Sequence, residues 1–127
     1  MQVSLELPAE AEAAAIAREV VSVALKKVPA AEDRIEDLRL LTSELVTNAV
    51  RHAGLTQADT IEVAVVISDE RVRVEVADTG PGFDPSDLPE PSVERAGGWG
   101  LRFVKQLADR WGVIRNDPNH VWFEVSL

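Results

Sequence analysis

Alternating hydrophobic and polar residues predict three strands in the first two thirds of the chain. Residues 3–7 alternate apolar with polar side chains, which is the pattern of a strand with one buried face. Two β-branched runs, residues 61–67 and 72–77, show a similar period and are separated by Asp69 and Glu70. We therefore expect a strand near the N-terminus and a hairpin in the middle of the chain.

Helical periodicity predicts two helices between these strands. Residues 9–27 are rich in Ala and Glu, place Ile16, Val20 and Val23 on one stripe, and stop before Pro29. A second helix is expected over about residues 32–53, because apolar residues recur there every three or four positions. The members of this second stripe are Leu38, Leu41, Leu45, Ala49 and Ala53.

The last third of the chain begins without any periodicity. Residues 78–98 contain most of the prolines, and an irregular segment of this length usually carries function. Helical spacing returns over residues 98–111, and residues 113–115 and 121–127 read as two closing strands. The element order predicts an α/β (α+β) two-layer sandwich, with helices on one face of a mixed, largely antiparallel sheet, and a single domain over residues 1–127.

Composition narrows the classes of protein that this fold could serve. Lys and Arg number 13 against 22 Asp and Glu, so the net charge of -9 argues against a nucleic-acid binder. The chain has no cysteine, which excludes disulfides, thiolate catalysis and cysteine-ligated zinc. No basic and apolar leader and no membrane-length apolar run are present, so we expect a cytoplasmic protein without a membrane partner.

Glu44 and Asn48 are the first pair of residues with candidate chemistry. They lie four residues apart on the predicted second helix and therefore share a face, which His52 continues. A carboxamide oxygen is a hard ligand suited to Mg²⁺, and a carboxylate one turn away could deprotonate a hydroxyl or a water. Considered alone, an ordinary polar helix surface explains the pair better.

Asp78 follows an apolar strand and precedes a glycine turn that contains Gly80 and Gly82. A carboxylate in this position can accept a hydrogen bond from an exocyclic amine such as that of adenine, and glycines let a flat base approach the backbone. The alternative is a plain turn, since Asp-x-Gly-Pro-Gly is good turn chemistry by itself. A calcium loop fits poorly, because glycines occupy positions where oxygen ligands are needed.

A second glycine cluster, Gly97-Gly98-Trp99-Gly100-Leu101, opens the third predicted helix. Bare backbone N–H groups at the start of a helix favour an anion such as phosphate. No Gly-Lys-Ser/Thr follows, so the segment is not a P-loop, and its spacing does not match a dinucleotide-binding fingerprint. A flexible hinge before a helix is about equally compatible with this cluster alone.

Taken together and in this order, the three segments resemble the N box and the two glycine boxes of the GHKL (Bergerat-fold) ATP-binding superfamily, which includes gyrase and the histidine kinases. Within it, the chain most resembles the anti-sigma factor serine/threonine kinases. The resemblance rests on Ser43-Glu44-Leu45-Val46-Thr47-Asn48-Ala49-Val50-Arg51-His52-Ala53, on residues 107–113 and on residues 121–125. It covers the chain from the second helix to the C-terminus and, more loosely, the part before it.

The resemblance implies ATP and Mg²⁺ as cofactors and gives each motif a role. Asn48 would bind Mg²⁺, Glu44 would be the catalytic general base, and Asp78 would recognise adenine. Residues 83–97 would form a lid. The full set of implied ATP-binding residues is Asn48, His52, Asp78, Gly80, Gly82, Gly98, Trp99, Gly100 and Leu101.

The resemblance also implies a function, and three alternatives stay open on the sequence. The first is an ATP-dependent protein serine/threonine kinase and anti-sigma factor, which binds a sigma factor, phosphorylates an anti-sigma antagonist and forms a homodimer. The second is a non-catalytic, nucleotide-gated protein-binding module. The third, ranked last, is plain ATP hydrolysis. A Glu44→Ala substitution separates the first two, because it should abolish transfer only if transfer occurs.

Overall fold

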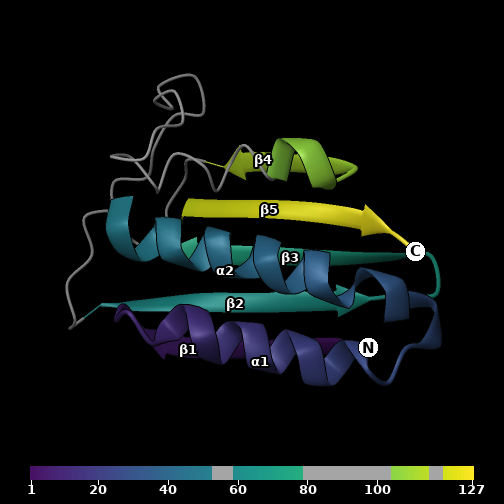
Figure 1. Cartoon of the computed structure of the whole chain (residues 1–127). Helices are drawn as coiled ribbons and strands as arrows, with labels where there is room; N and C mark the ends of the chain where they lie inside the picture. Colours follow the sequence, from purple (N-terminus) through teal and green to yellow (C-terminus); the bar gives the residue numbers. More distant parts are fainter. Residues whose placement is uncertain (53–58, 79–103, 115–118) are drawn as a thin grey trace.

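Two helices and five strands make up the part of the chain described by the computed structural model, which comprises residues 1–52, 59–78, 104–114 and 119–127 (Figure 1). A 3₁₀ segment, η1, connects the two helices, and one further helical turn covers residues 104–107. None of the described helices combines the length and apolarity needed to cross a bilayer. In chain order the labelled elements are β1 (Gln2–Pro8), α1 (Ala13–Leu25), η1 (Pro29–Arg34), α2 (Ile35–His52), β2 (Thr60–Ile67), β3 (Arg71–Asp78), β4 (Arg110–Ile114) and β5 (Asn119–Ser126).

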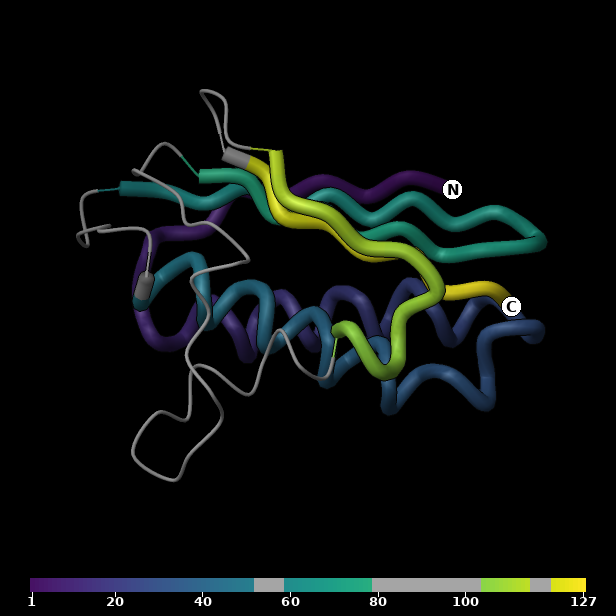
Figure 2. The backbone as a smooth tube through the Cα atoms, turned by 90° about the horizontal axis from the view of Figure 1, so that it is seen from above, coloured from purple at the N-terminus to yellow at the C-terminus, as the bar shows by residue number. Residues whose placement is uncertain are grey.

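The five strands form one sheet in the order β1-β2-β3-β5-β4. All four neighbouring pairs are antiparallel. Figure 2 shows both helices in one layer beneath this sheet, so the opposite face of the sheet is open among the described elements. The two-layer sandwich predicted from the sequence is thereby confirmed, and the described sheet is antiparallel throughout rather than mixed.

The hydrophobic core fills the space between the helices and the sheet. Alternate residues of β2 and β3 are buried, as the period-two pattern predicts, and Phe123 of β5 is the largest fully buried side chain. On α2 four members of the predicted apolar stripe, Leu38, Leu41, Leu45 and Ala49, are buried as expected, and the fifth, Ala53, lies outside the described residues. Burying these apolar surfaces is the main driving force for the fold.

Helix α1 buries a different stripe from the one that the sequence predicted. Ile16 and Val23 are 45% and 48% exposed, whereas the buried positions are mostly small. Alanine allows the helix backbone to approach its neighbours closely, so the helix turns its small residues inward and leaves bulkier ones in solvent. The buried residues of α1 are Ala13, Ala17, Val21, Ser22, Ala24 and Leu25.

Two element boundaries also differ from the prediction. The second helix starts at Ile35 rather than near Glu32, because Pro29–Arg34 forms a separate 3₁₀ segment with its proline in the first turn. Trp111, predicted at the end of a helix, lies in β4 and pairs with Phe123 of β5. Residue 111 continues the helical spacing of residues 104 and 107 in the sequence, but in the structure it belongs to a strand.

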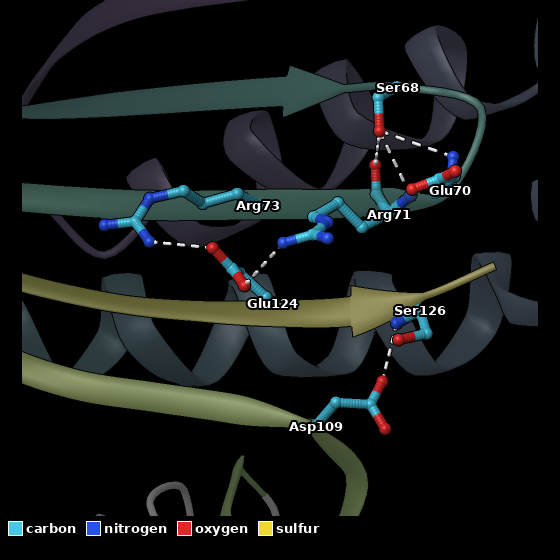
Figure 3. A network of polar contacts seen from close by, with 7 residues as sticks. All are labelled: Ser68, Glu70, Arg71, Arg73, Asp109, Glu124 and Ser126. Atoms are coloured by element: carbon cyan, nitrogen blue, oxygen red, sulfur yellow. Dashed lines mark hydrogen bonds and ion pairs between the residues drawn. The ribbon is translucent and has the colours of Figure 1, made fainter.

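Polar residues on the open face of the sheet form a connected network around Glu124 (Figure 3). Its carboxylate accepts a hydrogen bond from Arg73 at 3.0 Å and pairs with Arg71 at 3.7 Å. The Arg73 guanidinium also lies 4.1 Å from the centre of the Trp122 ring, a cation–π contact. Trp122, which precedes the buried Phe123 along β5, therefore lies on the open face.

Candidate functional site

The predicted site residues of α2 and β3 meet at one end of the sandwich. Figure 1 shows that α2 and β3 run in the same direction, so that their C-terminal ends lie at the same end of the molecule. Asp78 is the last residue of β3 and shares the helix-facing side with Val74 and Val76, since alternate residues of this strand are buried. The fold thus brings Asp78 to the helix layer beside the last turns of α2.

Asn48 is a buried side chain with an unused acceptor. Only 4% of its surface is exposed, and its Oδ1 atom has no hydrogen-bond partner among the described residues. Leaving a buried polar atom unpaired costs about 1–3 kcal/mol, so such an atom in a folded protein calls for an explanation. A metal ion coordinated by the carboxamide oxygen would supply that explanation.

Glu44 lies one helical turn before Asn48 on α2 and is half-buried. Burial raises the pKa of its carboxyl group above the ordinary value of 4.5, and the positive charge of Arg51 acts in the opposite direction. A carboxylate with a raised pKa holds a proton more readily, which suits a group that accepts one during a reaction. Arg51 was not among the residues predicted for the site, although its spacing of seven from Glu44 was visible in the sequence.

Asp78 is 6% exposed, which is rare for a carboxylate unless it is engaged by other groups. In the sheet it stands opposite Asn119, the first residue of β5. The role predicted for Asp78, an acceptor on the wall of a nucleotide pocket, stays a prediction that its burial and strand-end position allow.

The remaining predicted residues lie partly or wholly outside the described part of the chain. His52 is the last residue of α2, and only its backbone is described. Residues 79–103 are not described, so the predicted lid, the site glycines Gly80, Gly82, Gly98 and Gly100, and the residues Trp99 and Leu101 stay predictions. The structure therefore brings together Glu44, Asn48 and Asp78.

The described donor set fits Mg-ATP better than a protein-bound metal. Among the residues that the structure describes, no group of three or more His, Asp or Glu could hold an ion without other ligands. Mg²⁺ usually keeps several waters and takes one or two protein oxygens besides the phosphates. The orphaned Oδ1 of Asn48 matches such a single ligand, and buried Asp78 matches an acceptor for a base amine.

Comparison with known families finds a match over nearly the whole chain. The model of the histidine kinase-like ATPase domain matches residues 7–125. The chain belongs to the histidine kinase-like ATPase family. Two proteins similar to this chain are serine-protein kinases named RsbW. The one from Listeria monocytogenes is 32% identical, over 85% of this chain and 76% of the relative. The other, from Bacillus licheniformis, is 34% identical, over 84% of this chain and 74% of the relative.

Solved structures agree with the family at the level of the fold. The RsbU and RsbW domains of a Mycobacterium tuberculosis protein superpose with a TM-score of 0.74 and 23% identity. That match covers 98% of this chain and 31% of the other, so the chain spans about a third of that polypeptide. A histidine kinase domain from Erythrobacter litoralis gives a TM-score of 0.55 with 28% identity, over 73% of this chain and 44% of the other. The likeness at 23% identity carries the two-layer architecture of the family to this chain and nothing more specific.

Proposed function

We propose that the protein is an ATP-dependent serine/threonine kinase of the RsbW type that acts as an anti-sigma factor, with residues 1–127 as one GHKL-type ATP-binding domain. The observation that carries the proposal is the unpartnered, buried Oδ1 of Asn48 one helical turn from the half-buried carboxyl of Glu44. The identity to serine-protein kinases over most of the chain supports it. An oxygen ligand and a proton acceptor on one helix face are two of the protein groups that such a transfer uses.

Each described site residue has one task in this mechanism. Asn48 would contribute its carboxamide oxygen to Mg²⁺, and Asp78 would accept a hydrogen bond from the adenine amine. Glu44 would accept the proton of a substrate serine while the serine oxygen bonds to phosphorus and the bond to the departing diphosphate breaks. Bound Mg-ATP would supply the phosphoryl group, and its Mg²⁺ would neutralise part of the phosphate charge. The protein would therefore contribute mainly by positioning the reactants and by electrostatic stabilisation.

The proposed partners are a sigma factor, which the protein would hold inactive, and an antagonist protein, which it would phosphorylate. The family resemblance supports these two classes, and the acidic charge of -9 accords with protein rather than nucleic-acid partners. We place this interaction in the cytoplasm as part of the same proposal. An affinity capture from host lysate tests this part, with Mg-ATP present and Asn48→Ala as the parallel bait. We expect the wild type to enrich a sigma factor or a small antagonist protein. We expect Asn48→Ala to lose the part of this enrichment that depends on the nucleotide.

An identical or empty catch for both baits would refute nucleotide-gated partner switching. Capture without any phosphate transfer, unchanged by Glu44→Gln, would instead favour the non-catalytic binding module. The two functions predict different results only for a substitution of Glu44, because both require the bound nucleotide and therefore Asn48. The substitution pair thus separates catalysis from nucleotide binding.

A homodimer forms part of the proposal, and the surface beside β1 supports it. Strand β1 is a sheet edge, and an apolar groove of about 280 Å³ lies between it and α1, lined by Met1, Val3, Val20 and Val23 among others. Exposed apolar surface beside an open edge strand favours association. Val23→Asp should give a monomer by light scattering, whereas the control Leu40→Asp, on the exposed side of α2, should not. An unchanged mass for Val23→Asp would contradict this surface.

A further inference from the structure

Strand β4 forms one edge of the sheet, and no described strand lies beyond it (Figure 1). An edge strand presents unpaired backbone N–H and C=O groups that can pair with a further strand. On its inner side β4 pairs with β5 along its whole length, from Arg110 to Ile114. Within the described part of the chain, its outer side is therefore the place where an extended segment of another polypeptide can be added.

Three residues of β4 share the open face of the sheet. Successive side chains of a strand alternate between its faces, and Trp111 stands opposite the fully buried Phe123 on the helix side. Arg110, Gly112 and Ile114 therefore belong to the other face. Arg110 is exposed, and Ile114 is an exposed large apolar residue at 39%. A strand added beyond β4 would place every second side chain beside one of these three positions.

Arg110 carries a positive charge that no described residue neutralises. Glu124, directly opposite on β5, is already engaged by Arg73 at 3.0 Å and by Arg71 at 3.7 Å. Among the described residues, Arg110 makes no ion pair or hydrogen bond. An exposed guanidinium of this kind is complementary to a carboxylate, so an acidic residue of a partner fits beside it.

Gly112 gives this row of residues an aromatic contact in its middle. The indole ring of Trp122 extends from β5 over β4, since a Cβ atom on residue 112 would lie 2.8 Å from Nε1 of the ring. Neighbouring strands lie about 4.8 Å apart, so a side chain opposite Gly112 on an added strand would pack against the edge of this ring. Trp and Arg are the residue types that contribute most binding energy at protein interfaces.

We propose that β4 binds an extended segment of a partner protein as a further strand of the sheet. An acidic residue of that segment would lie beside Arg110, and apolar residues would lie beside Gly112 and Ile114. The backbone pairing supplies affinity in this mode of recognition, and the alternate side chains supply specificity. The inference does not depend on the proposed kinase function, because no residue of the proposed nucleotide site takes part.

A second copy of this chain fits the β4 edge less well than an acidic segment. In a symmetric antiparallel pair of β4 strands centred on Gly112, Arg110 would face Ile114 and would gain no counter-charge. The surface proposed for the homodimer lies beside β1, at the opposite edge of the sheet. Binding of a segment at β4 therefore leaves the proposed dimer surface free.

Titration of the full chain with short synthetic peptides tests the proposal. The test peptide carries glutamate, leucine and valine at alternate positions with threonine between them, and a second peptide has the same residues in reverse order, because an added strand can run in either direction. Fluorescence anisotropy measures binding, and NMR measures amide hydrogen exchange. We expect one of the peptides to bind and to slow exchange in residues 110–114 but not in β1. No binding of either peptide at about 1 mM, or slowed exchange in β1 instead, would overturn the proposal.

Charge reversal at Arg110 gives the more specific readout. Arg110→Glu should weaken binding of the glutamate peptide about fivefold or more and should favour a peptide with lysine in place of glutamate. The control Arg34→Glu makes the same change of charge on η1, where the side chain is 45% exposed, and should alter neither affinity. Equal losses for the two variants would mean that net charge alone attracts the peptide, and would overturn the proposal. So would slow exchange in residues 110–114 of the protein alone that strengthens with its concentration, because a second copy would then occupy the edge.

Discussion

The indole ring of Trp122 lies against the backbone of Gly112, its partner across the β4–β5 pair. A Cβ atom on residue 112 would lie 2.8 Å from Nε1 and 2.9 Å from two ring carbons of Trp122. The ring cannot move away freely, because the Arg73 guanidinium lies 4.1 Å from its centre and is itself bound to Glu124. The glycine at this position is therefore required by the packing of one aromatic ring.

Gly112→Ala should lower the free energy of unfolding by about 1–3 kcal/mol, the usual cost of forcing atoms into a packed site. Urea denaturation measures this loss. In a Trp122→Ala background the same change should cost much less, since the ring that it meets is gone. An equal cost in both backgrounds would show that the ring contact is not the reason for the glycine.

Glu44→Gln should lower the activity of the protein and raise its free energy of unfolding at neutral pH. Because burial raises the pKa of Glu44 in the folded protein, the folded state binds this proton more tightly than the unfolded chain. The stability that the group contributes is complete below the unfolded value near 4.5 and is lost as the pH rises through the folded value. The glutamine variant, which carries no charge, should be more stable than the wild type at pH 7 by a small amount, because solvent screens the half-exposed group. Unfolding curves at pH 4 and pH 7 test the sign, and a variant less stable at pH 7 would contradict it.

Asn48→Ala should remove the stabilisation that Mg-ATP gives to the folded protein. At a ligand concentration one hundred times the Kd, binding adds about 2.7 kcal/mol to the wild type. The variant should show little or no rise in Tm with Mg-ATP, while its circular dichroism without nucleotide stays native. Equal thermal shifts for both proteins would mean that the unpartnered Oδ1 is not a ligand of the bound metal.

Thr42 presents the second buried polar atom of α2 without a described partner. Its Oγ1 is inaccessible to solvent and makes no hydrogen bond to a described residue. Thr42→Val keeps the shape and removes the hydroxyl, so the free energy of unfolding should rise by about 1 kcal/mol. Thr42→Ser, which keeps the hydroxyl and loses a methyl group, should be less stable by about 1 kcal/mol. A less stable valine variant would reveal a buried partner for the hydroxyl, such as an ordered water.

Local patterns predicted the architecture well because each helix and strand has one buried face. The alternation in residues 61–67 and 72–77 reappears as β2 and β3, and the leucine stripe of α2 is buried as expected. The stripe of α1 was predicted on the wrong side, since periodicity favours large apolar residues whereas close helix packing selected Ala13 and Ala17. Which side of α1 is buried depends on tertiary packing, and a pattern along the sequence does not describe tertiary packing.

The site was predictable in its residue types and not in its electrostatics. Spacing alone placed Glu44 and Asn48 on one helix face, and a strand-end position marked Asp78. Residue spacing does not show how deeply Asn48 is buried, nor the opposing effects of burial and Arg51 on the pKa of Glu44. The open-face position of Trp122 was not predictable for a related reason: its strand has two faces, and only the folded sheet shows which face the helices cover.

Transfer of phosphate to a serine is the central claim, and one experiment addresses it most directly. Wild type and Glu44→Gln would each be incubated with γ-labelled Mg-ATP and lysate from a host strain that lacks this protein, and phosphoserine would be identified by mass spectrometry. The nucleotide affinity of both proteins would be measured alongside. We predict a newly phosphorylated small protein with the wild type and none with Glu44→Gln, at comparable nucleotide affinity. Tight nucleotide binding by the wild type, with no phosphoserine above the variant, would contradict the account.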